Sequence, residues 1–188
     1  LEKQSTRISL YESAAQKLRE SGYLYECFET PKELELKRRK QLSMGRPPVY
    51  DRHSLNLSSA EKNRLRAERQ GYWRFKLDQR RIEWEDGITG KVSIDTGSLS
   101  DTVLIRADGQ FLYTLASVVD DIDFGINQVI RGSDHVTNTA TQIQLLENLG
   151  SRKPSFAHHS LLVGPKGEPL SKRMNNLSLK EFKETGLE

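Results

Sequence analysis

The spacing of apolar residues changes at Tyr72, and this change limits the fold more than any other feature of the chain. Before Tyr72 the apolar residues lie at helical spacing, whereas after it they form short runs rich in aromatic and β-branched residues. Helical spacing is typical of amphipathic helices, and such short runs are typical of strands. The sequence therefore predicts an α/β fold whose first third is helical.

Start and stop signals predict three helices in that first third. Residues 8–18 carry an approximate apolar stripe, and Gly22 follows as a stop signal. Thr30 and Ser58 each stand three residues before a glutamate, which is the pattern of a capping box. The second helix is expected to begin at Pro31 and to end at Gly45 and the Pro47-Pro48 pair, and the third to run from Ser59 to about Gln70.

The rest of the chain alternates strands with helices. A small antiparallel sheet is expected from residues 72–77, 81–84 and 91–94, because glycine and aspartate separate these runs. Beyond it, alternating strands and helices favour a parallel sheet. The elements expected there are strands at 102–106, 129–130 and 156–163 and helices at 112–119 and 138–149, the last closed by Gly150.

Composition excludes several classes of protein. The single cysteine, Cys27, rules out a disulfide framework and any site that needs two thiolates. No run approaches the roughly 20 apolar residues that cross a bilayer, so no membrane partner and a cytoplasmic location are expected. The net charge of +3 is too small to indicate nucleic-acid binding by itself. A length of 188 residues fits one domain, or one domain with a small appendage.

Two groups of residues have the chemistry of a binding site. Ser171, Lys172 and Arg173 follow a strand in a loop rich in glycine and proline, where they would offer donors to a triphosphate. The alternative is a solvated basic loop. Tyr113 and Arg131 would bind a carboxylate through a phenol and a guanidinium. The alternative for this pair is a core aromatic and a surface ion pair.

Other residues carry weaker signals. His158 and His159 do not predict a shared metal ion, because neighbouring residues of a strand point to opposite faces. Cys27 has no second cysteine or histidine at ligand spacing, so an inert buried thiol is the expectation. The chain contains no P-loop motif and no Gly-x-Ser-x-Gly motif.

Several segments together resemble one family. In chain order they are residues 113–121 (YTLASVVDD), 129–135 (VIRGSDH), 161–162 (LL) and 170–173 (LSKR). This order resembles the second half of the catalytic domain of bacterial glutamyl-tRNA synthetases, which are class I aminoacyl-tRNA synthetases. Residues 22–28, 72–75 and 100–109 resemble the same family, so the resemblance spans essentially the whole chain.

The resemblance implies a fold and a reaction. The fold would be the second half of a Rossmann-like nucleotide-binding fold with an inserted α+β connective region. Residues 1–19 would lead from the first half, 20–100 would form the insertion near the tRNA acceptor end, and 101–188 would complete the catalytic fold. The family activates L-glutamate with ATP and Mg²⁺ and transfers it to tRNA(Glu). The parent enzyme is expected to be monomeric.

The resemblance also assigns roles to positions in this sequence. Tyr113, Ser117 and Arg131 match positions that line the glutamate pocket. Asp134 matches an acidic position beside the nucleotide, and Leu162 falls where the backbone reads adenine. ATP would therefore contact Asp134, Leu162 and, from the signature loop, Lys172.

The signature loop carries the catalytic assignments. Ser171, Lys172 and Arg173 match it, and Lys172 would stabilise the pentacoordinate phosphate and the leaving pyrophosphate. Pro169 replaces the first lysine of that loop, so one cation is missing. Some relatives carry a structural zinc, but Cys27 is the only cysteine here, so neither zinc nor another metal site is predicted. His135 stands where the family often has tryptophan.

The family's His-x-Gly-His-type motif is missing from this sequence. The chain is therefore interpreted as a fragment of a glutamate–tRNA ligase that is inactive alone. One alternative is a stand-alone glutamyl transferase acting on a modified tRNA base, and another is a non-catalytic tRNA- or nucleotide-binding module. Basic residues of the insertion are suited to phosphate contacts or simply to solvation, and they are Lys37, Arg38, Arg39, Lys40, Arg64, Arg66 and Arg69.

Overall fold

A computed structural model describes residues 2–163 as a mixed α/β structure with two sheets. The helices are α1 (Ile8–Glu20), α2 (Pro31–Ser43), α3 (Ser59–Glu68), α4 (Tyr113–Asp123) and α5 (Val136–Leu149). The strands are β1 (Leu24–Cys27), β2 (Tyr72–Phe75), β3 (Arg81–Asp86), β4 (Gly90–Asp95), β5 (Val103–Ile105), β6 (Gln128–Gly132) and β7 (Ser155–His159). Short 3-10 turns lie at Gln4–Thr6, His53–Asn56, Thr96–Ser98 and Ser133–His135.

The helix signals act as predicted. Thr30 Oγ1 accepts a hydrogen bond from the backbone N–H of Glu33, and Ser58 Oγ accepts one from that of Glu61, so both capping boxes form. Gly22 has a φ of +76°, the left-handed conformation that commonly ends a helix. Helix α3 ends at Glu68, before the expected Gln70, and α4 continues to Asp123.

Strand pairing corrects one prediction and confirms another. The strands β2, β3 and β4 do not share one sheet, as was expected. Instead β2 pairs antiparallel with β1 and β5, whereas the β3–β4 hairpin joins β7 in a sheet of order β4-β3-β7-β6. The β6–β7 and β3–β7 pairs are parallel, which confirms the parallel sheet. Strand β1 carried no strand prediction, and β7 ends at His159 instead of Val163.

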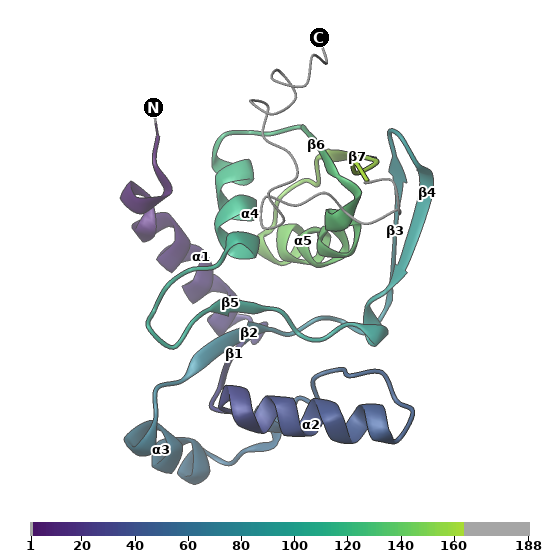
Figure 1. The fold of residues 1–188 in the computed structure, drawn as a ribbon. Helices are drawn as coiled ribbons and strands as arrows, with labels where there is room; N and C mark the ends of the chain where they lie inside the picture. The colour runs from purple at the N-terminus through teal and green to yellow at the C-terminus, as the bar shows by residue number, and fades with distance from the viewer. Residues whose placement is uncertain (1, 164–188) are drawn as a thin grey trace, which may run out of the picture.

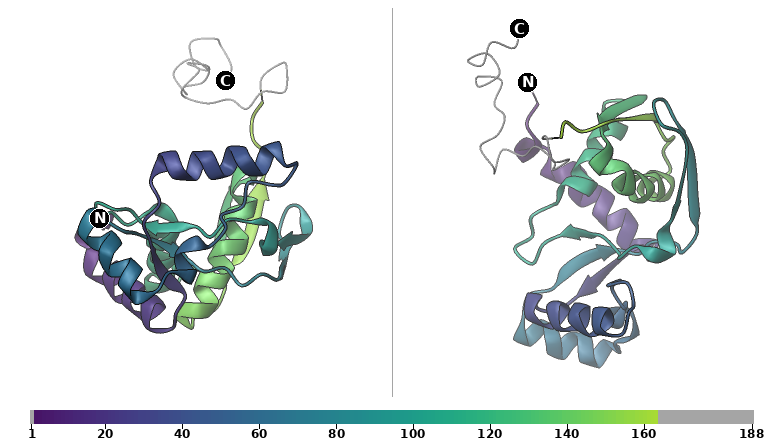
Figure 2. Two further views of the ribbon diagram at one scale, coloured as in Figure 1. Left: turned by 90° about the horizontal axis from the view of Figure 1, so that it is seen from below. Right: turned by 45° about the vertical axis from the view of Figure 1, so that its right-hand side comes forward.

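A single hydrophobic core joins the two sheets. Figure 1 shows α4 and α5 beside β6 and β7, with α1 alongside, while α2 and α3 lie at the lower end of the molecule. The right-hand view of Figure 2 shows the same separation. The fully buried side chains come from both regions and include Leu18, Phe75, Leu77, Leu104, Leu115 and Leu145. Each sheet contains strands from both sides of residue 100: β5 joins β1 and β2 in one sheet, and β7 joins β3 in the other.

Within residues 2–163, no helix has the length and apolar character needed to span a membrane.

Candidate active site

The candidate site lies where two parallel strands end and two helices begin. Arg131 is near the end of β6 and is paired in register with His158 near the end of β7. Tyr113 is the first residue of α4, and α5 begins just after the turn that follows β6. In open α/β sheets, ligands bind outside the carboxyl ends of the strands. The fold thus places Arg131, with its predicted partner Tyr113, at such an edge.

Arg131 is held by four uncharged side-chain contacts. Its Nη1 donates to the hydroxyl oxygen of Tyr113 at 3.2 Å. Its Nη2 donates to Thr139 Oγ1 at 2.5 Å and to Gln142 Oε1 at 2.6 Å. Its Nε lies 3.4 Å from Nε2 of His158. The structure therefore brings Tyr113 and Arg131 together, and among residues 2–163 Arg131 has no ion pair.

The charge of Arg131 has no close counter-ion. Among residues 2–163, no carboxylate oxygen lies within 4.0 Å of its guanidinium. Arg7, by contrast, contacts Asp120 at 2.8 Å and Asp123 at 2.7 Å. Burial raises the pKa of Asp121, and Arg131 lies close enough for its charge to lower that pKa, although the two groups are not in contact. A cation that no carboxylate contacts attracts an anion more strongly than a paired one does, because less of its field is cancelled.

Ser117 reaches the arginine only through Gln142. The Nε2 group of Gln142 donates to Ser117 Oγ at 3.0 Å, while its Oε1 accepts from Arg131. Ser117 thus fixes the amide orientation of Gln142 and couples α4 to α5. Tyr113 is half exposed and packs its ring edge-on against His135, with 5.6 Å between ring centroids.

The two predicted nucleotide-binding residues within the described part of the chain are both exposed. Asp134 is exposed within the turn Ser133–His135, and Leu162 is 68% exposed. Gly132 allows a close approach here: a Cβ on it would lie 2.5 Å from Asp134 Oδ1 and 2.8 Å from Leu161 Cδ2. Ser171, Lys172, Arg173 and the substituted Pro169 lie outside the described residues.

Asp86 and His158 form a buried pair, and His158 contacts Arg131. Asp86 ends β3, and its Oδ2 is 2.5 Å from Nδ1 of His158. Both side chains are fully buried. Burial alone would raise the pKa of Asp86, but hydrogen bonds from His158 and from the backbone N–H groups of Thr89 and Ile88 lower it well below its usual value. Asp86 is therefore ionised, and it anchors the imidazole.

Metal binding finds no support in the described part of the chain. Residues 2–163 contain no group of three or more histidine, cysteine, aspartate or glutamate side chains that could hold a metal ion. His158 is buried and His159 is exposed, as expected for neighbours on a strand. Cys27 is buried with its Sγ 3.5 Å from the hydroxyl of Tyr50, and burial raises the pKa of its thiol to about 11. The thiol is protonated at neutral pH.

Most of the basic residues proposed for phosphate contacts pair with carboxylates. Arg66 contacts Glu26 at 2.7 Å, and Arg69 contacts Glu33 at 2.9 Å. Exposed pairs of this kind contribute about 0–1 kcal/mol each, so a phosphate can replace the carboxylate at little cost. The other pairs are Lys37 with Glu29 and Asp51, Arg38 and Arg39 with Glu35, and Arg64 with Glu68.

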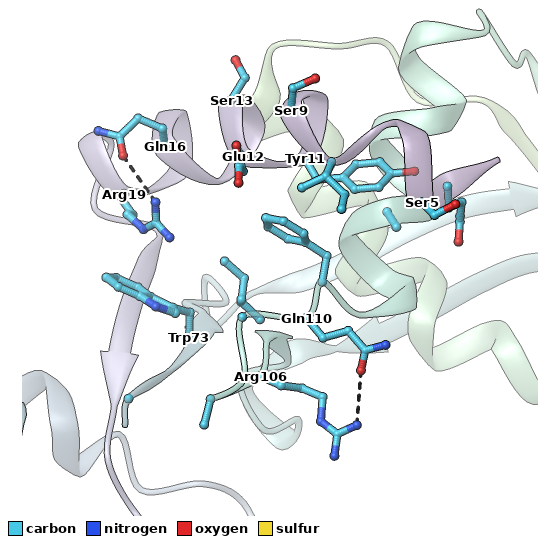
Figure 3. Close-up of a pocket in the computed structure, with 18 residues that line it drawn as sticks. Ser5, Ser9, Tyr11, Glu12, Ser13, Gln16, Arg19, Trp73, Arg106 and Gln110 are labelled. Atoms are coloured by element: carbon cyan, nitrogen blue, oxygen red, sulfur yellow. Dashed lines mark hydrogen bonds between the residues drawn. The ribbon is translucent and has the colours of Figure 1, made fainter. Parts of the chain in front are cut away.

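A large cavity lies apart from Arg131. It has a volume of about 1000 Å³ and runs along α1 to the segment 105–111. Figure 3 shows Ser5, Ser9 and Ser13 on α1 and the turn before it, with Trp73 and Arg106 on the opposite wall. None of the predicted site residues lines it.

Four residues that hold Arg131 were missed by sequence reasoning. Thr139 and Gln142 are buried polar residues on α5, and Asp86 and His158 are a buried ionisable pair. Buried polar side chains need hydrogen-bond partners, so polar residues on the apolar face of a predicted helix indicate a buried hydrogen-bond network. The pairing of Asp86 with His158 joins strands 72 residues apart, for which no local signal exists.

Comparisons with known proteins agree on one family. The family model for tRNA synthetases class I (E and Q), catalytic domain, matches residues 1–187. A protein named glutamate–tRNA ligase 2 from Ruegeria sp. (strain TM1040) is 65% identical over 188 residues, which are 100% of this chain and 43% of that protein. Glutamate–tRNA ligase 1 from Roseobacter denitrificans is 63% identical, again over 43% of its length. The chain thus spans less than half of these relatives.

Solved structures give the same result. A glutamate–tRNA ligase from Elizabethkingia meningosepticum, crystallised in complex with its amino acid, superposes with a TM-score of 0.80 at 32% identity. The match covers 98% of this chain and 37% of that one. A glutamate–tRNA synthetase from Elizabethkingia anophelis also gives 0.80 at 32% identity. The chain therefore belongs to the family of class I tRNA synthetases for E and Q, within their catalytic domain.

Proposed function

We propose that this chain is part of a glutamate–tRNA ligase that activates L-glutamate with ATP and Mg²⁺ and transfers it to tRNA(Glu). The observation that carries the proposal is the guanidinium of Arg131, whose partners within the described residues are all neutral. Such a cation selects a side-chain carboxylate over an amide, because an uncharged amide gains much less from its field. The names of the relatives support this choice.

The proposed roles follow the geometry. Arg131 and Tyr113 would bind the side-chain carboxylate of glutamate, and Ser117 would support them through Gln142. Asp134 and the backbone at Leu162 would contact ATP on the neighbouring exposed surface. Lys172, with Ser171 and Arg173, would stabilise the transferred charge on the phosphates.

The wider organisation is also a proposal. Residues 101–188 would belong to a Rossmann-like half-fold, entered through residues 1–19, and the α+β region of residues 20–100 would approach the acceptor end of tRNA. The coverage of 43% of the relatives supports the interpretation of the chain as a fragment. Since a site built from two halves cannot position ATP and glutamate with one half missing, the 188-residue chain alone should not turn over. The full-length protein would be a cytoplasmic monomer without a structural zinc.

Glutamate-dependent exchange between ATP and pyrophosphate, measured on the full-length protein, tests the proposal. Glutamate should stimulate exchange and glutamine should not. Arg131→Gln should lower kcat/KM for glutamate by at least about 30-fold, since losing a buried charge partner costs roughly 2–5 kcal/mol. Arg106→Gln is the matched control, because Arg106 is exposed and its guanidinium contacts only Gln110, at 3.4 Å, within the described residues.

Four results would each contradict part of the proposal. Exchange that glutamate does not stimulate would exclude the ligase, and tRNA binding without exchange would favour the non-catalytic module. Equal effects of the Arg131 and Arg106 variants would exclude the assigned pocket. Turnover by the 188-residue chain alone, abolished by Lys172→Ala, would contradict its interpretation as an incomplete site.

A further inference from the structure

The carboxylate of Asp86 has an unusually complete set of donors. Its Oδ1 accepts from the backbone N–H groups of His158 (3.0 Å), Ile88 (3.1 Å) and Thr89 (3.1 Å). Its Oδ2 accepts from Trp84 Nε1 at 3.2 Å and faces Nδ1 of His158 at 2.5 Å. An ionised carboxylate can only accept hydrogen bonds, so Nδ1 of His158 must carry a proton.

The other nitrogen of His158 faces Thr139 and Arg131. Nε2 lies 2.9 Å from Thr139 Oγ1 and 3.4 Å from Arg131 Nε. The Nε–H of Arg131 points at Nε2 of His158, and a guanidinium has no acceptor, so Nε2 must present its lone pair to the arginine. His158 is therefore neutral, with its proton on Nδ1 and its lone pair on Nε2.

This assignment fixes the hydroxyl of Thr139. Its oxygen accepts from Arg131 Nη2 at 2.5 Å, and its single proton has two acceptors in reach. These are Nε2 of His158 at 2.9 Å and the carbonyl oxygen of His135 at 3.2 Å. The shorter contact takes the proton. The donors of this series then all point the same way, from Arg131 through Thr139 and His158 to Asp86.

From this geometry we infer that Asp86, His158 and Thr139 form a positioning relay that orients the guanidinium of Arg131 for an amino-acid carboxylate. The inference rests on the proposed function, since it assigns a role to residues behind the proposed glutamate pocket. Hydrogen bonds aligned between a cation and an anion polarise one another and strengthen the whole series. None of the three residues would touch the substrate.

The neutral links explain why an acid is placed behind the arginine without touching it. A carboxylate in direct contact with Arg131 would cancel its charge and compete with the substrate. Thr139 and His158 separate the two charges, so the acid orients the guanidinium while Nη1 and Tyr113 stay available at the exposed side. The relay thus combines a fixed orientation with an unneutralised cation.

The variant Asp86→Asn gives a specific prediction for the histidine tautomer. Three backbone N–H groups point at the Oδ1 position, so the amide oxygen must occupy it. The amide NH₂ then faces Nδ1 of His158 and donates to it. The imidazole proton must move to Nε2, where it opposes the Thr139 hydroxyl proton and the Nε–H of Arg131.

Long-range ¹H–¹⁵N NMR of the histidine rings in the 188-residue chain reads this tautomer directly. His158 is assigned from the spectrum of a His158→Asn variant. The unaltered chain should show the neutral Nδ1–H form, and Asp86→Asn should show the Nε2–H form. A neutral Nε2–H form or an imidazolium at neutral pH in the unaltered chain would overturn the relay, whatever the protein's function.

Kinetics of the full-length protein test the positioning role. Thr139→Val keeps the shape of the side chain but removes the hydroxyl, and it should raise KM for glutamate about tenfold, as expected for losing one hydrogen bond to a charged group. KM for ATP should not change. Thr141→Val is the matched control: Thr141 is buried on the same helix and forms no side-chain hydrogen bond within residues 2–163. Thr139→Ser, which keeps the hydroxyl, should recover most of the glutamate affinity.

The possible failures are distinguishable. If the unaltered full-length protein does not activate glutamate, the proposed function fails, and the positioning role fails with it. If it activates glutamate but Thr139→Val behaves like Thr141→Val, only the positioning role fails. A weakening in the Thr139→Val variant that Thr139→Ser does not recover would also overturn the relay, because packing instead of the hydroxyl would then be responsible.

Discussion

Replacement of Asp101 by alanine should be among the most destabilising single changes in this chain. Asp101 is 1% exposed and lies two residues before β5. Its Oδ2 accepts from the Tyr25 hydroxyl at 2.6 Å, and its Oδ1 accepts from Arg52 Nη2 at 2.8 Å and from the Leu77 backbone N–H at 3.0 Å. Three donors therefore depend on one buried carboxylate.

The magnitude follows from what each donor loses. The N–H of Leu77 and the hydroxyl of Tyr25 are buried, and each would cost about 1–3 kcal/mol when left without an acceptor. Arg52 is 23% exposed and keeps the carbonyl of Leu77, so its loss adds about 1 kcal/mol or less. The sum for Asp101→Ala is roughly 2–7 kcal/mol, against about 5–15 kcal/mol for a typical domain.

Asp101→Asn separates charge from hydrogen bonding. The amide oxygen can accept from Arg52 and Leu77, and the NH₂ group can donate to the Tyr25 hydroxyl oxygen. The ionic component of the Arg52 interaction then disappears, and the hydroxyl proton of Tyr25 must turn away from residue 101, so we expect about 1–2 kcal/mol for this variant. Glu85→Ala is the control, because Glu85 is exposed and has no ion pair or side-chain hydrogen bond in the described part of the chain.

Urea denaturation of the 188-residue chain, followed by circular dichroism, measures these differences as shifts in the midpoint at constant slope. The expected order of destabilisation is Asp101→Ala, then Asp101→Asn, then Glu85→Ala near zero. The reasoning is refuted if Asp101→Ala costs less than about 1.5 kcal/mol, or if the asparagine variant costs as much as the alanine variant. The first result would mean that Tyr25 and Leu77 find other acceptors, and the second that charge alone matters.

Three further predictions use other sites. Burial raises the pKa of Cys27 to about 11, so the unfolded chain loses this proton first, and the free energy of unfolding should begin to fall at about pH 9 in urea titrations. Cys27→Ala should remove the part of the fall below about pH 10, because burial also raises the pKa of Tyr25, Tyr50 and Tyr72, which add to the fall above that pH. Folding lowers the pKa of Asp86, so its ionised form contributes fully to the free energy of unfolding above about pH 4 and contributes less as the pH falls further. Asp86→Asn should therefore make the free energy of unfolding less dependent on pH below about pH 4. Gly132→Ala should displace the side chains of Asp134 and Leu161 and raise KM for ATP more than KM for glutamate in exchange assays of the full-length protein; an unchanged KM for ATP would argue against nucleotide contact at Asp134.

Local signals predicted the helices because their causes are local. The capping boxes at Thr30 and Ser58 join residues three apart, and both form. The stop at Gly22 depends on a backbone conformation that glycine adopts without strain. Interactions between residues so close in the chain can be predicted from a single sequence, so the starts of α2 and α3 and the end of α1 were predictable.

Strand pairing was harder to predict because the paired residues lie far apart in the sequence. The runs at β2, β3 and β4 follow one another and look alike, so proximity favoured a single sheet. The structure instead pairs Trp73 with Glu26 and Asp86 with Phe156, residues separated by 47 and 70 positions in the sequence. The alternation of buried and exposed residues along β3 shows which face is inward but not which strand lies alongside.

In the candidate site too, some side chains could be predicted from the sequence and others could not. Tyr113 and Arg131 were predicted because a phenol and a guanidinium have recognisable carboxylate-binding chemistry, and they do meet, at 3.2 Å. Thr139 and His158 were not predicted for this site, because a threonine and a buried histidine have many possible partners and only the fold selects one. Residues that touch a ligand are thus easier to predict than residues that hold them in place.

The arginines of this chain show what an anion site requires beyond a positive charge. Arg7 and Arg52 each contact a carboxylate at 2.8 Å, and their charges are used in holding elements together. Arg131 is as fully hydrogen-bonded as they are, yet its partners are a phenol, an alcohol, an amide and an imidazole. Rigidity and charge are therefore separable: neutral acceptors can fix a guanidinium while leaving its field for a ligand. A site that must recognise a carboxylate needs both, and in the described part of this chain Arg131 has them at the carboxyl edge of a parallel sheet.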